Sequence, residues 1–228
     1  VNVPNVSTND IIVAKQQRGG NYPGWRLELN PSGVSLGEVS FALSHNWLAS
    51  PKNAIRIYTT TTPITADTWH NIIITYDGTV THVAANCTIY VDGASQAFTT
   101  QFDDLDASTA TSTDFNIGQW DTETSFRFLG KMCDLSIFNS VLSAPDIALI
   151  SANTLDLSAD LSVTPVSWWR IGEKATSDGT DWTVEDQIGS NDVESLSMAV
   201  SARVGNAPDS INNGLTINME SDDRVAPS

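Results

Sequence analysis

The first 140 residues contain many short runs in which apolar and polar residues alternate. In one of them Trp25, Leu27 and Leu29 occupy one face of the chain. Arg26 and Glu28 occupy the opposite face. Strict alternation is typical of strands that bury one face in an antiparallel sheet. We therefore expect a half-buried strand here, with the two charged residues on its polar side.

Similar runs recur along this part of the chain. Ile55 and Ile57 stand opposite Arg56 and Tyr58, and Ile72, Ile74 and Tyr76 share a face; further runs are IIVAK, SFALS, CTIYVDG, QAFTTQF, DFNIG and FLGKMCDLSIFN. Turn residues separate them at a spacing of about ten residues, which favours a sandwich or a barrel. The pattern predicts an all-β, antiparallel two-sheet sandwich over residues 1–152.

One segment carries a helix signal. Ser143 is a suitable N-cap residue, Asp146 follows three positions later, and Pro145 is tolerated in a first turn. We expect a short helix from Ser143 to about Ala152.

The amino-acid composition changes after this helix. Residues 153–228 are rich in Ser, Asp, Asn and Thr, yet they contain the aromatic and apolar stretches VSWWRIG, DWTVEDQIGSND and GLTINMESDDR. Such a segment is too aromatic for a plain disordered tail and too polar for a core of its own. We expect an acidic, extended C-terminal segment that packs on the sandwich or on neighbouring subunits.

The charge balance limits the range of partners. The net charge is −16, and the 11 Lys and Arg residues are spread along the sequence without a cluster. Nucleic acid is a poor partner for such a chain, because phosphate binding depends on Lys and Arg. The acidity is explained either by solubility in a salty medium or by cation binding. No run of about 18 apolar residues is present, so we expect no membrane insertion.

The two cysteines, Cys87 and Cys133, leave two alternatives open. Cys87 is in phase with Ile89 and Val91, and Cys133 is in phase with Leu135 and Ile137. Both thiols should therefore face inward, either bonded to each other or as free packed thiols. The cellular compartment decides between these outcomes.

Five motifs in order identify a family resemblance. TWHNIIITYDG is followed by IYVDG, by Asn116-Ile117-Gly118, by FLGKMCDLSIFN and by LSAPDI. This series resembles the laminin-G-like, concanavalin-A-like jelly roll over residues 10–152. The resemblance implies that the two Asp-Gly pairs are structural turns. The family's first strands are missing before residue 11, and Cys133 stands where the family more often has Asp.

The C-terminal segment carries a narrower resemblance. TLDLSADL, VSWWRIGE and DQIGSNDVES are similar to the end of laminin-G-like virion proteins of marine bacteriophages. This resemblance implies a virion component at the capsid or tail surface, present in symmetric multiple copies beside other virion subunits.

Candidate chemistry lies in the loops rather than in a catalytic motif. The paired-carboxylate strand of the β-glucanases is absent, since VEDQ and MESDDR lack its spacing, and neither a Ser-His-Asp motif nor a phosphate loop occurs. We therefore expect no enzyme. Hard carboxylate oxygens suit Ca²⁺, and the laminin-G family often carries one Ca²⁺ at the sandwich rim; the candidate ligands are Asp103, Asp104, Asp106 and Asp121.

Two tryptophans in polar surroundings are candidates for stacking on sugar rings. Trp47 lies in SHNWLAS and Trp120 in GQWDTET, and an exposed indole offers an apolar face to a sugar. Two functions follow from the sequence as alternatives. One is a non-enzymatic virion structural protein that aids attachment to host-surface glycans. The other is a carbohydrate-binding module of a secreted or cell-surface bacterial protein.

Overall fold

The computed structural model describes residues 1–6, 9–30, 36–79, 81–122, 126–152, 157, 160–171, 174–195, 203–204 and 216–218. The chain divides into two compact units. The sandwich unit comprises Pro4–Thr68 and Ile72–Leu129. The C-terminal unit comprises Val1–Val3, Trp69–Asn71 and Gly130–Ser228.

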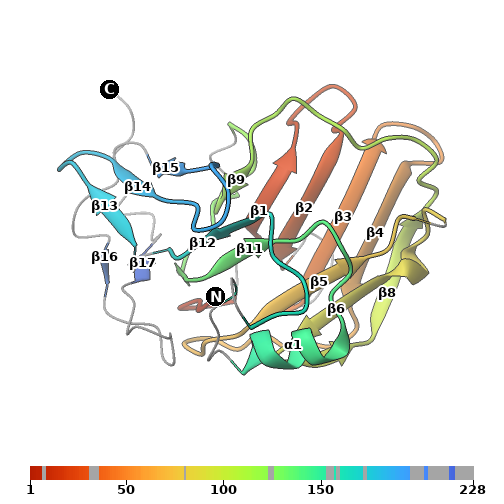
Figure 1. The fold of residues 1–228 in the computed structure, drawn as a ribbon. Coiled ribbons are helices and arrows are strands. Elements are labelled where there is room, and N and C mark those ends of the chain that lie inside the picture. Colours follow the sequence, from red (N-terminus) through yellow and green to blue (C-terminus); the bar gives the residue numbers. More distant parts are fainter. Residues whose placement is uncertain are drawn as a thin grey trace. The chain divides into compact units, whose positions relative to one another are not determined.

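The larger sheet of the sandwich unit has six antiparallel strands in the order β8-β4-β3-β2-β1-β9 (Figure 1). Their bounds are β1 Asp10–Gln16, β2 Gly24–Leu29, β3 Val39–Asn46, β4 Asn53–Thr59, β8 Phe98–Asp103 and β9 Asn116–Ile117. β1 is an inner strand, because it pairs with β2 on one side and with β9 on the other. The β9 segment therefore covers the edge at which the sequence predicted missing N-terminal strands; whether further strands belong there stays a prediction.

The smaller sheet consists of β5 Ile72–Tyr76, β6 Cys87–Val91 and β7 Ala94–Gln96, with a single 3₁₀ turn, η1 Ala84–Asn86, before β6. Asp92 and Gly93 connect β6 to β7 with φ angles of 51° and 78°. Positive φ at both positions is the geometry of a two-residue hairpin turn, which Asp-Gly adopts readily. The Asp-Gly pair thus has the structural role expected from the sequence.

The apolar faces of the two sheets form the core of the sandwich unit. Alternate residues of β3 and β4, namely Val39, Phe41, Leu43, Ile55 and Ile57, are buried. On the smaller sheet Cys87, Ile89 and Val91 are buried, and their register partners in β5 are the residues that share a face in the sequence pattern. The alternation predicted the buried faces of β4 and β6, but in β5 Ile73 and Thr75 are buried while Ile72, Ile74 and Tyr76 are half-buried. The expected antiparallel two-sheet sandwich is confirmed.

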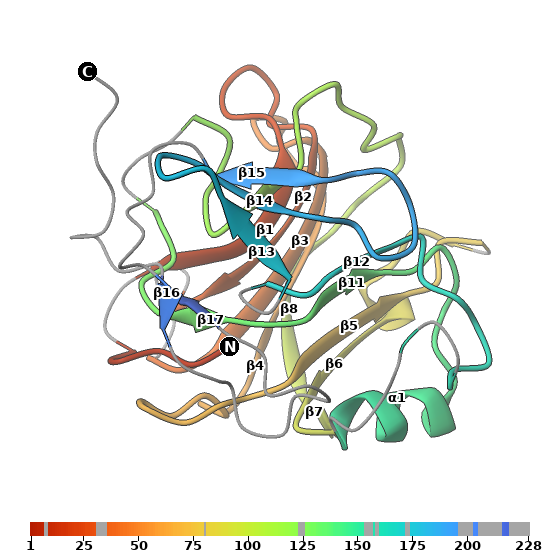
Figure 2. The same ribbon diagram turned by 60° about the vertical axis from the view of Figure 1, so that its left-hand side comes forward.

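The C-terminal unit is built from short elements (Figure 2). Their bounds are β10 Lys131–Met132, β11 Leu135–Ile137, α1 Ala144–Ser151, β12 Ser167–Trp169, β13 Ala175–Ser177, β14 Trp182–Val184, β15 Val193–Ser195, β16 Arg203–Val204 and β17 Thr216–Asn218. β11 pairs with β12, β13-β14-β15 form a meander, and β17 lies between β10 and β16, all antiparallel. No helix in the described part of the chain is long and apolar enough to span a membrane.

The predicted helix is α1. The Ser143 hydroxyl accepts a hydrogen bond from the Asp146 backbone N–H at 3.3 Å, and the Asp146 carboxylate accepts from the Ser143 N–H at 3.3 Å. This reciprocal pair is a capping box, which satisfies two N–H groups at the helix start. Asp146 also accepts from the Ser162 N–H at 2.8 Å and from the Ser162 hydroxyl at 2.5 Å. The cap thereby holds the chain that follows the helix.

The tryptophans of the C-terminal segment act as anchors within the C-terminal unit. Trp168, Trp169 and Trp182 are all at most 5% exposed. The Trp169 indole N–H donates to the Asn191 carbonyl at 2.7 Å, and the Trp168 backbone N–H donates to the Asp186 carboxylate at 2.9 Å. The described part of the segment thus forms a local meander held by bonds between its own residues. Packing of the segment on the sandwich or on neighbouring subunits stays a prediction, and the stretch MESDDR lies outside the described residues.

Candidate functional site

Charged side chains cross the polar face of the six-stranded sheet. The strand registers place Ala14, Arg26, Ala42, Arg56 and Phe102 in one transverse row across β1, β2, β3, β4 and β8. Two strand spacings of about 4.8 Å separate the two arginines. The small side chain of Ala42 stands between them, so both guanidinium groups have room above β3.

Glu28 joins the two arginines from the neighbouring row. Its carboxylate accepts from Arg26 Nε at 3.1 Å and from Arg56 Nη2 at 2.8 Å. The Ser40 hydroxyl donates to the same carboxylate at 3.3 Å. Arg26 also donates to Gln16 Oε1, and Arg56 donates to Gln101 Oε1 at 2.8 Å. A continuous polar network therefore runs from β1 to β8.

The charged centre of this network is buried, which the sequence pattern did not predict, whereas Gln101 at its β8 end is exposed. Arg26, Glu28 and Arg56 are 7%, 3% and 8% exposed. The alternation of apolar and polar residues instead predicts half-buried strands with these charged residues on the polar side. Burial by itself would raise the pKa of Glu28, but the charges and hydrogen bonds of Arg26 and Arg56 outweigh it and lower the pKa below its usual value. The carboxylate is therefore ionised, and it balances buried positive charge.

Two indoles flank the Arg26 guanidinium. The Arg26 Cζ lies 4.9 Å from the centroid of the Trp47 ring and 4.8 Å from that of the Trp120 ring. Trp47 follows β3 and packs edge-on against Phe102 at 5.3 Å, and the Trp120 indole N–H donates to the Gln16 carbonyl at 3.1 Å. Both indoles are half-buried. The structure thus brings the two predicted stacking residues together on one face.

Two further cations lie beside these rings. Arg18 Cζ is 5.5 Å from the Trp120 centroid, and Lys52 Nζ is 5.8 Å from the Trp47 centroid. Arg18 is exposed and Lys52 is half-buried. Basic residues that are spread along the sequence therefore lie near the same two rings in the folded chain, because strand pairing gathers residues that are far apart in sequence.

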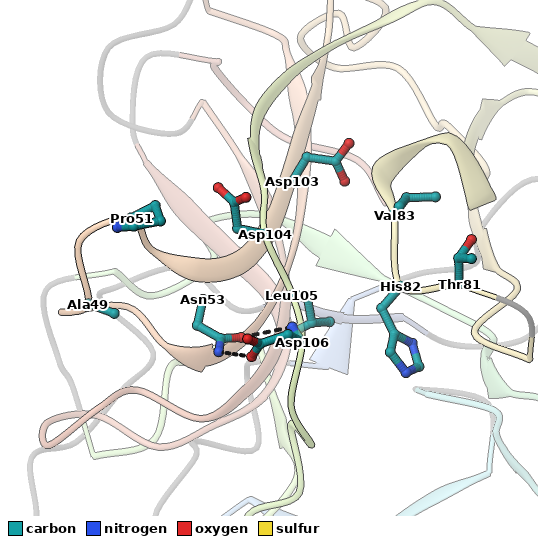
Figure 3. A pocket seen from close by; sticks show the side chains of 10 residues that line it. All are labelled: Ala49, Pro51, Asn53, Thr81, His82, Val83, Asp103, Asp104, Leu105 and Asp106. Carbon is teal, nitrogen blue, oxygen red and sulfur yellow. Dashed lines mark hydrogen bonds between the residues drawn. The ribbon is translucent and has the colours of Figure 1, made fainter.

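A pocket of about 610 Å³ lies where β4 begins at Asn53 and β8 ends at Asp103 (Figure 3). It is lined by Ala49, Pro51, Asn53, Thr81, His82, Val83, Asp103, Asp104, Leu105 and Asp106. Three of the four predicted calcium ligands therefore lie at one pocket. Asp121 is not among the lining residues; its carboxylate accepts from the Arg18 backbone N–H at 2.8 Å.

The three carboxylates at the pocket do not converge on one point. Figure 3 shows Asp103 and Asp104 on opposite sides of the chain, as expected for consecutive residues in an extended segment. Asp103 accepts from the Ala84 N–H at 2.5 Å, and Asp106 exchanges hydrogen bonds with the Asn53 side chain. Within the described residues no group of three or more His, Cys, Asp or Glu side chains is placed to hold a metal ion. This arrangement does not fit a calcium site, and calcium binding stays a prediction.

Both cysteines are free thiols in the structure, which agrees with the second of the two alternatives. Cys87 is buried, as its phase predicted, and Cys133 is only half-buried. Desolvation raises the pKa of each thiol to about 12, with Asp103 contributing at Cys87 and Asp134 at Cys133. Neither thiol is therefore set up as a nucleophile.

Sequence reasoning found Trp47 and Trp120 but missed the network beneath them. A signal was present, because Arg26, Glu28 and Arg56 all occupy the polar phase of strongly apolar strands. The sequence does not say which strands are neighbours, so it could not show that these residues meet.

Comparisons with known proteins add the family. Residues 1–148 match the family model described as the concanavalin A-like lectin/glucanases superfamily. No curated protein and no solved structure matches the chain. The match covers well over half of the chain and includes all the motifs of the resemblance up to α1. The chain therefore belongs to the concanavalin A-like lectin/glucanases superfamily.

Proposed function

We propose that this chain is a non-enzymatic glycan-binding protein, and that the glycan is received by the two half-buried indoles, Trp47 and Trp120, which lie beside the buried Arg26 guanidinium of the six-stranded sheet. The observation that carries the proposal is the pair of half-buried indoles, Trp47 and Trp120, on either side of the Arg26 guanidinium. An indole offers a flat apolar surface to the C–H face of a sugar ring. Membership of a lectin-containing superfamily supports the proposal, although a fold alone does not fix a function.

The polar network gives these indoles a fixed position. Trp47 packs on Phe102 and lies beside Arg26 and Arg56, whose own hydrogen bonds hold them against Glu28. Trp120 is tied to β1 through the Gln16 carbonyl. A ligand therefore does not have to order these side chains, and that entropic cost is avoided on binding.

The test is retention on immobilised polysaccharides and titration with soluble oligosaccharides. Trp47→Ala and Trp120→Ala should each weaken binding by about fivefold or more, since one stacked aromatic ring contributes on the order of 1 kcal/mol. Trp25→Ala is the matched control, because it removes an indole from the opposite face of β2. If all three variants bound the glycan as tightly as the native chain does, this face would be rejected as the site. Release of reducing ends from the bound polysaccharide would reject the non-enzymatic part of the proposal.

We further propose that the module is displayed on a bacteriophage particle in symmetric multiple copies. The similarity of TLDLSADL, VSWWRIGE and DQIGSNDVES to phage virion proteins supports this role. The alternative is a module of a secreted or cell-surface bacterial protein. Protein mass spectrometry of purified phage particles separates the two, because a particle component is found in virions and a secreted module is found in the culture medium. Light scattering of the isolated chain adds a second test, since a component present in symmetric multiple copies should form oligomers.

Calcium binding through Asp103, Asp104 and Asp106 is retained only as a proposal to be tested. An ion that binds the native state raises its melting temperature. A higher Tm in millimolar calcium than in chelator, abolished by Asp104→Asn, would support a site at the pocket. Identical melting curves would reject it, as the divergent carboxylates suggest.

A further inference from the structure

Positive charge is concentrated around one indole. Arg26, Lys52 and Arg56 place their cationic groups 4.9, 5.8 and 5.9 Å from the Trp47 centroid. The chain has only 11 Lys and Arg against 27 Asp and Glu, so a local excess of cations is distinctive. Glu28 is shared by Arg26 and Arg56, so Lys52 is the cation beside this ring that Glu28 does not engage.

The hydrogen-bonding groups near Trp47 are mainly donors. Arg and Lys side chains donate and never accept. The acceptor oxygens of Glu28 are engaged by Arg26, Arg56 and Ser40, and that residue is 3% exposed. Lys52 is half-buried, and its ammonium group donates to the Trp47 carbonyl at 2.8 Å, which fixes it beside the ring. A ligand that lies on this indole must therefore bring acceptors, and an anionic group brings the strongest ones.

We propose that the Trp47 end of this face binds an acidic saccharide. The sugar ring lies against the outer part of the Trp47 indole, and its carboxylate or sulfate group meets the Lys52 ammonium and the cationic surroundings. This inference rests on the proposed glycan-binding function and names the ligand class for it. The Trp120 end differs, because the Asp121 carboxylate lies beside the Arg18 backbone there and lowers the local positive charge.

An acidic glycan suits this face better than a nucleic acid does. Nucleic-acid binding draws on many Lys and Arg residues along the phosphate backbone, and the chain has only 11 Lys and Arg in all. One anionic group on a sugar that stacks on Trp47 needs only the cations around that ring.

The experiment compares four ligands on the full chain by affinity electrophoresis and calorimetry: a polyuronate, a sulfated galactan, a neutral galactan and single-stranded DNA. We expect binding to one or both acidic polysaccharides, at least about tenfold tighter than to the neutral one, and weakened by raising NaCl from 50 to 500 mM because the ion contacts are screened. The polyuronate and sulfated arms show whether carboxylate or sulfate is the recognised group.

Two matched variants assign the effect to Lys52. Lys52→Gln should weaken binding to the acidic polysaccharide about fivefold or more, since it removes one charge-assisted contact. Lys174→Gln removes the same charge at an exposed position of the C-terminal unit and should leave binding unchanged. Melting curves of both variants check that the fold is retained.

The possible results separate this inference from the function on which it rests. Equal affinity for neutral and acidic galactans, or no effect of Lys52→Gln, overturns the acidic-saccharide inference while glycan binding stands. Binding to no polysaccharide overturns both. Tight binding to DNA that Lys52→Gln weakens, with no glycan binding, overturns both and assigns the face to nucleic acid.

Discussion

The two units bury carboxylates in different ways. In the sandwich unit Glu28 is held by two cations, Arg26 and Arg56. In the C-terminal unit Asp146 and Asp186 are held by neutral donors: hydroxyl groups and backbone N–H groups. All three carboxylates have a pKa below the usual value. Cationic partners in one unit and neutral donors in the other therefore both favour the ionised carboxylate.

The difference lies in what remains when a carboxylate is removed. Without Glu28, two guanidinium groups would stay buried without a counter-charge. Without Asp186, the groups left behind are neutral N–H donors. An uncompensated buried charge costs more than an unsatisfied neutral donor. Stability around Glu28 therefore depends on charge balance across strands, whereas stability around Asp146 and Asp186 depends on hydrogen bonds from nearby hydroxyl and backbone N–H groups.

The largest effect is expected for Glu28→Ala. Removal of one partner from a buried ion pair destabilises a protein by about 3–5 kcal/mol, so we expect a loss of that size in the free energy of unfolding. Urea denaturation followed by circular dichroism measures it. Asp114→Ala, an exposed carboxylate of the same unit, is the control and should change stability little. If the two variants were equally stable, the charge-balance interpretation would be wrong.

An intermediate effect is expected for Asp186→Ala. Asp186 accepts from the backbone N–H groups of Trp168 and Ile188 at 2.9 and 3.2 Å. Loss of hydrogen bonds to a charged acceptor costs about 2–3 kcal/mol. Urea unfolding followed by circular dichroism reports the change. Asp178→Ala is the control, because that exposed carboxylate also caps two backbone N–H groups; a cost as large as that of Asp186→Ala would contradict the importance of burial.

A smaller effect is expected at the start of α1. Ser143→Ala removes an N-cap and should cost about 1 kcal/mol. Thermal melting by circular dichroism at neutral pH is the measurement, and Ser140→Ala, which changes an exposed serine outside the helix, is the control. No loss of Tm in Ser143→Ala would show that the capping box contributes nothing.

The same cap should also give a pH signature. Hydrogen bonds from the Ser143 and Ser162 hydroxyls lower the pKa of Asp146 from 3.8 to about 2. Because the folded-state pKa is the lower one, the stabilisation is present above pH 3.8 and is lost as the pH falls toward 2. The Tm difference between the native chain and Asp146→Asn should therefore shrink over that range. A constant difference would contradict the lowered pKa.

The smallest effect is expected for the two thiols. Desolvation raises the pKa of Cys87 and of Cys133 to about 12. Because the thiolate is the reactive form, a disulfide reagent at pH 8 should leave both thiols of the native chain unmodified and modify both after denaturation. Modification of neither thiol in urea without reductant would show instead that they are bonded to each other.

Local chemistry in the sequence accounts for much of the fold. Alternation placed Leu27 and Leu29 on the buried face and Arg26 and Glu28 on the other, and Ser143 with Asp146 marked the start of α1. These predictions succeeded because strand faces and helix caps depend on residues that are two to four positions apart.

The candidate site was only partly predictable. Trp47 and Trp120 stand out in the sequence because they are aromatic residues in polar stretches, but their meeting at Arg26 depends on how β3 pairs with β2 and how Gln16 receives the Trp120 N–H. The acidic run 103–106 suggested a metal site, yet the extended backbone turns consecutive carboxylates to opposite sides.

The sequence by itself therefore determined where the main strands of the sandwich unit lie and where the helix begins. Tertiary structure alone decided that Arg26, Glu28 and Arg56 are buried, that the two arginines share Glu28 across β3, and that cations scattered along an acidic chain gather around Trp47. The physical reason is that strand order and register are set by the packing of the whole sheet, which no local pattern encodes.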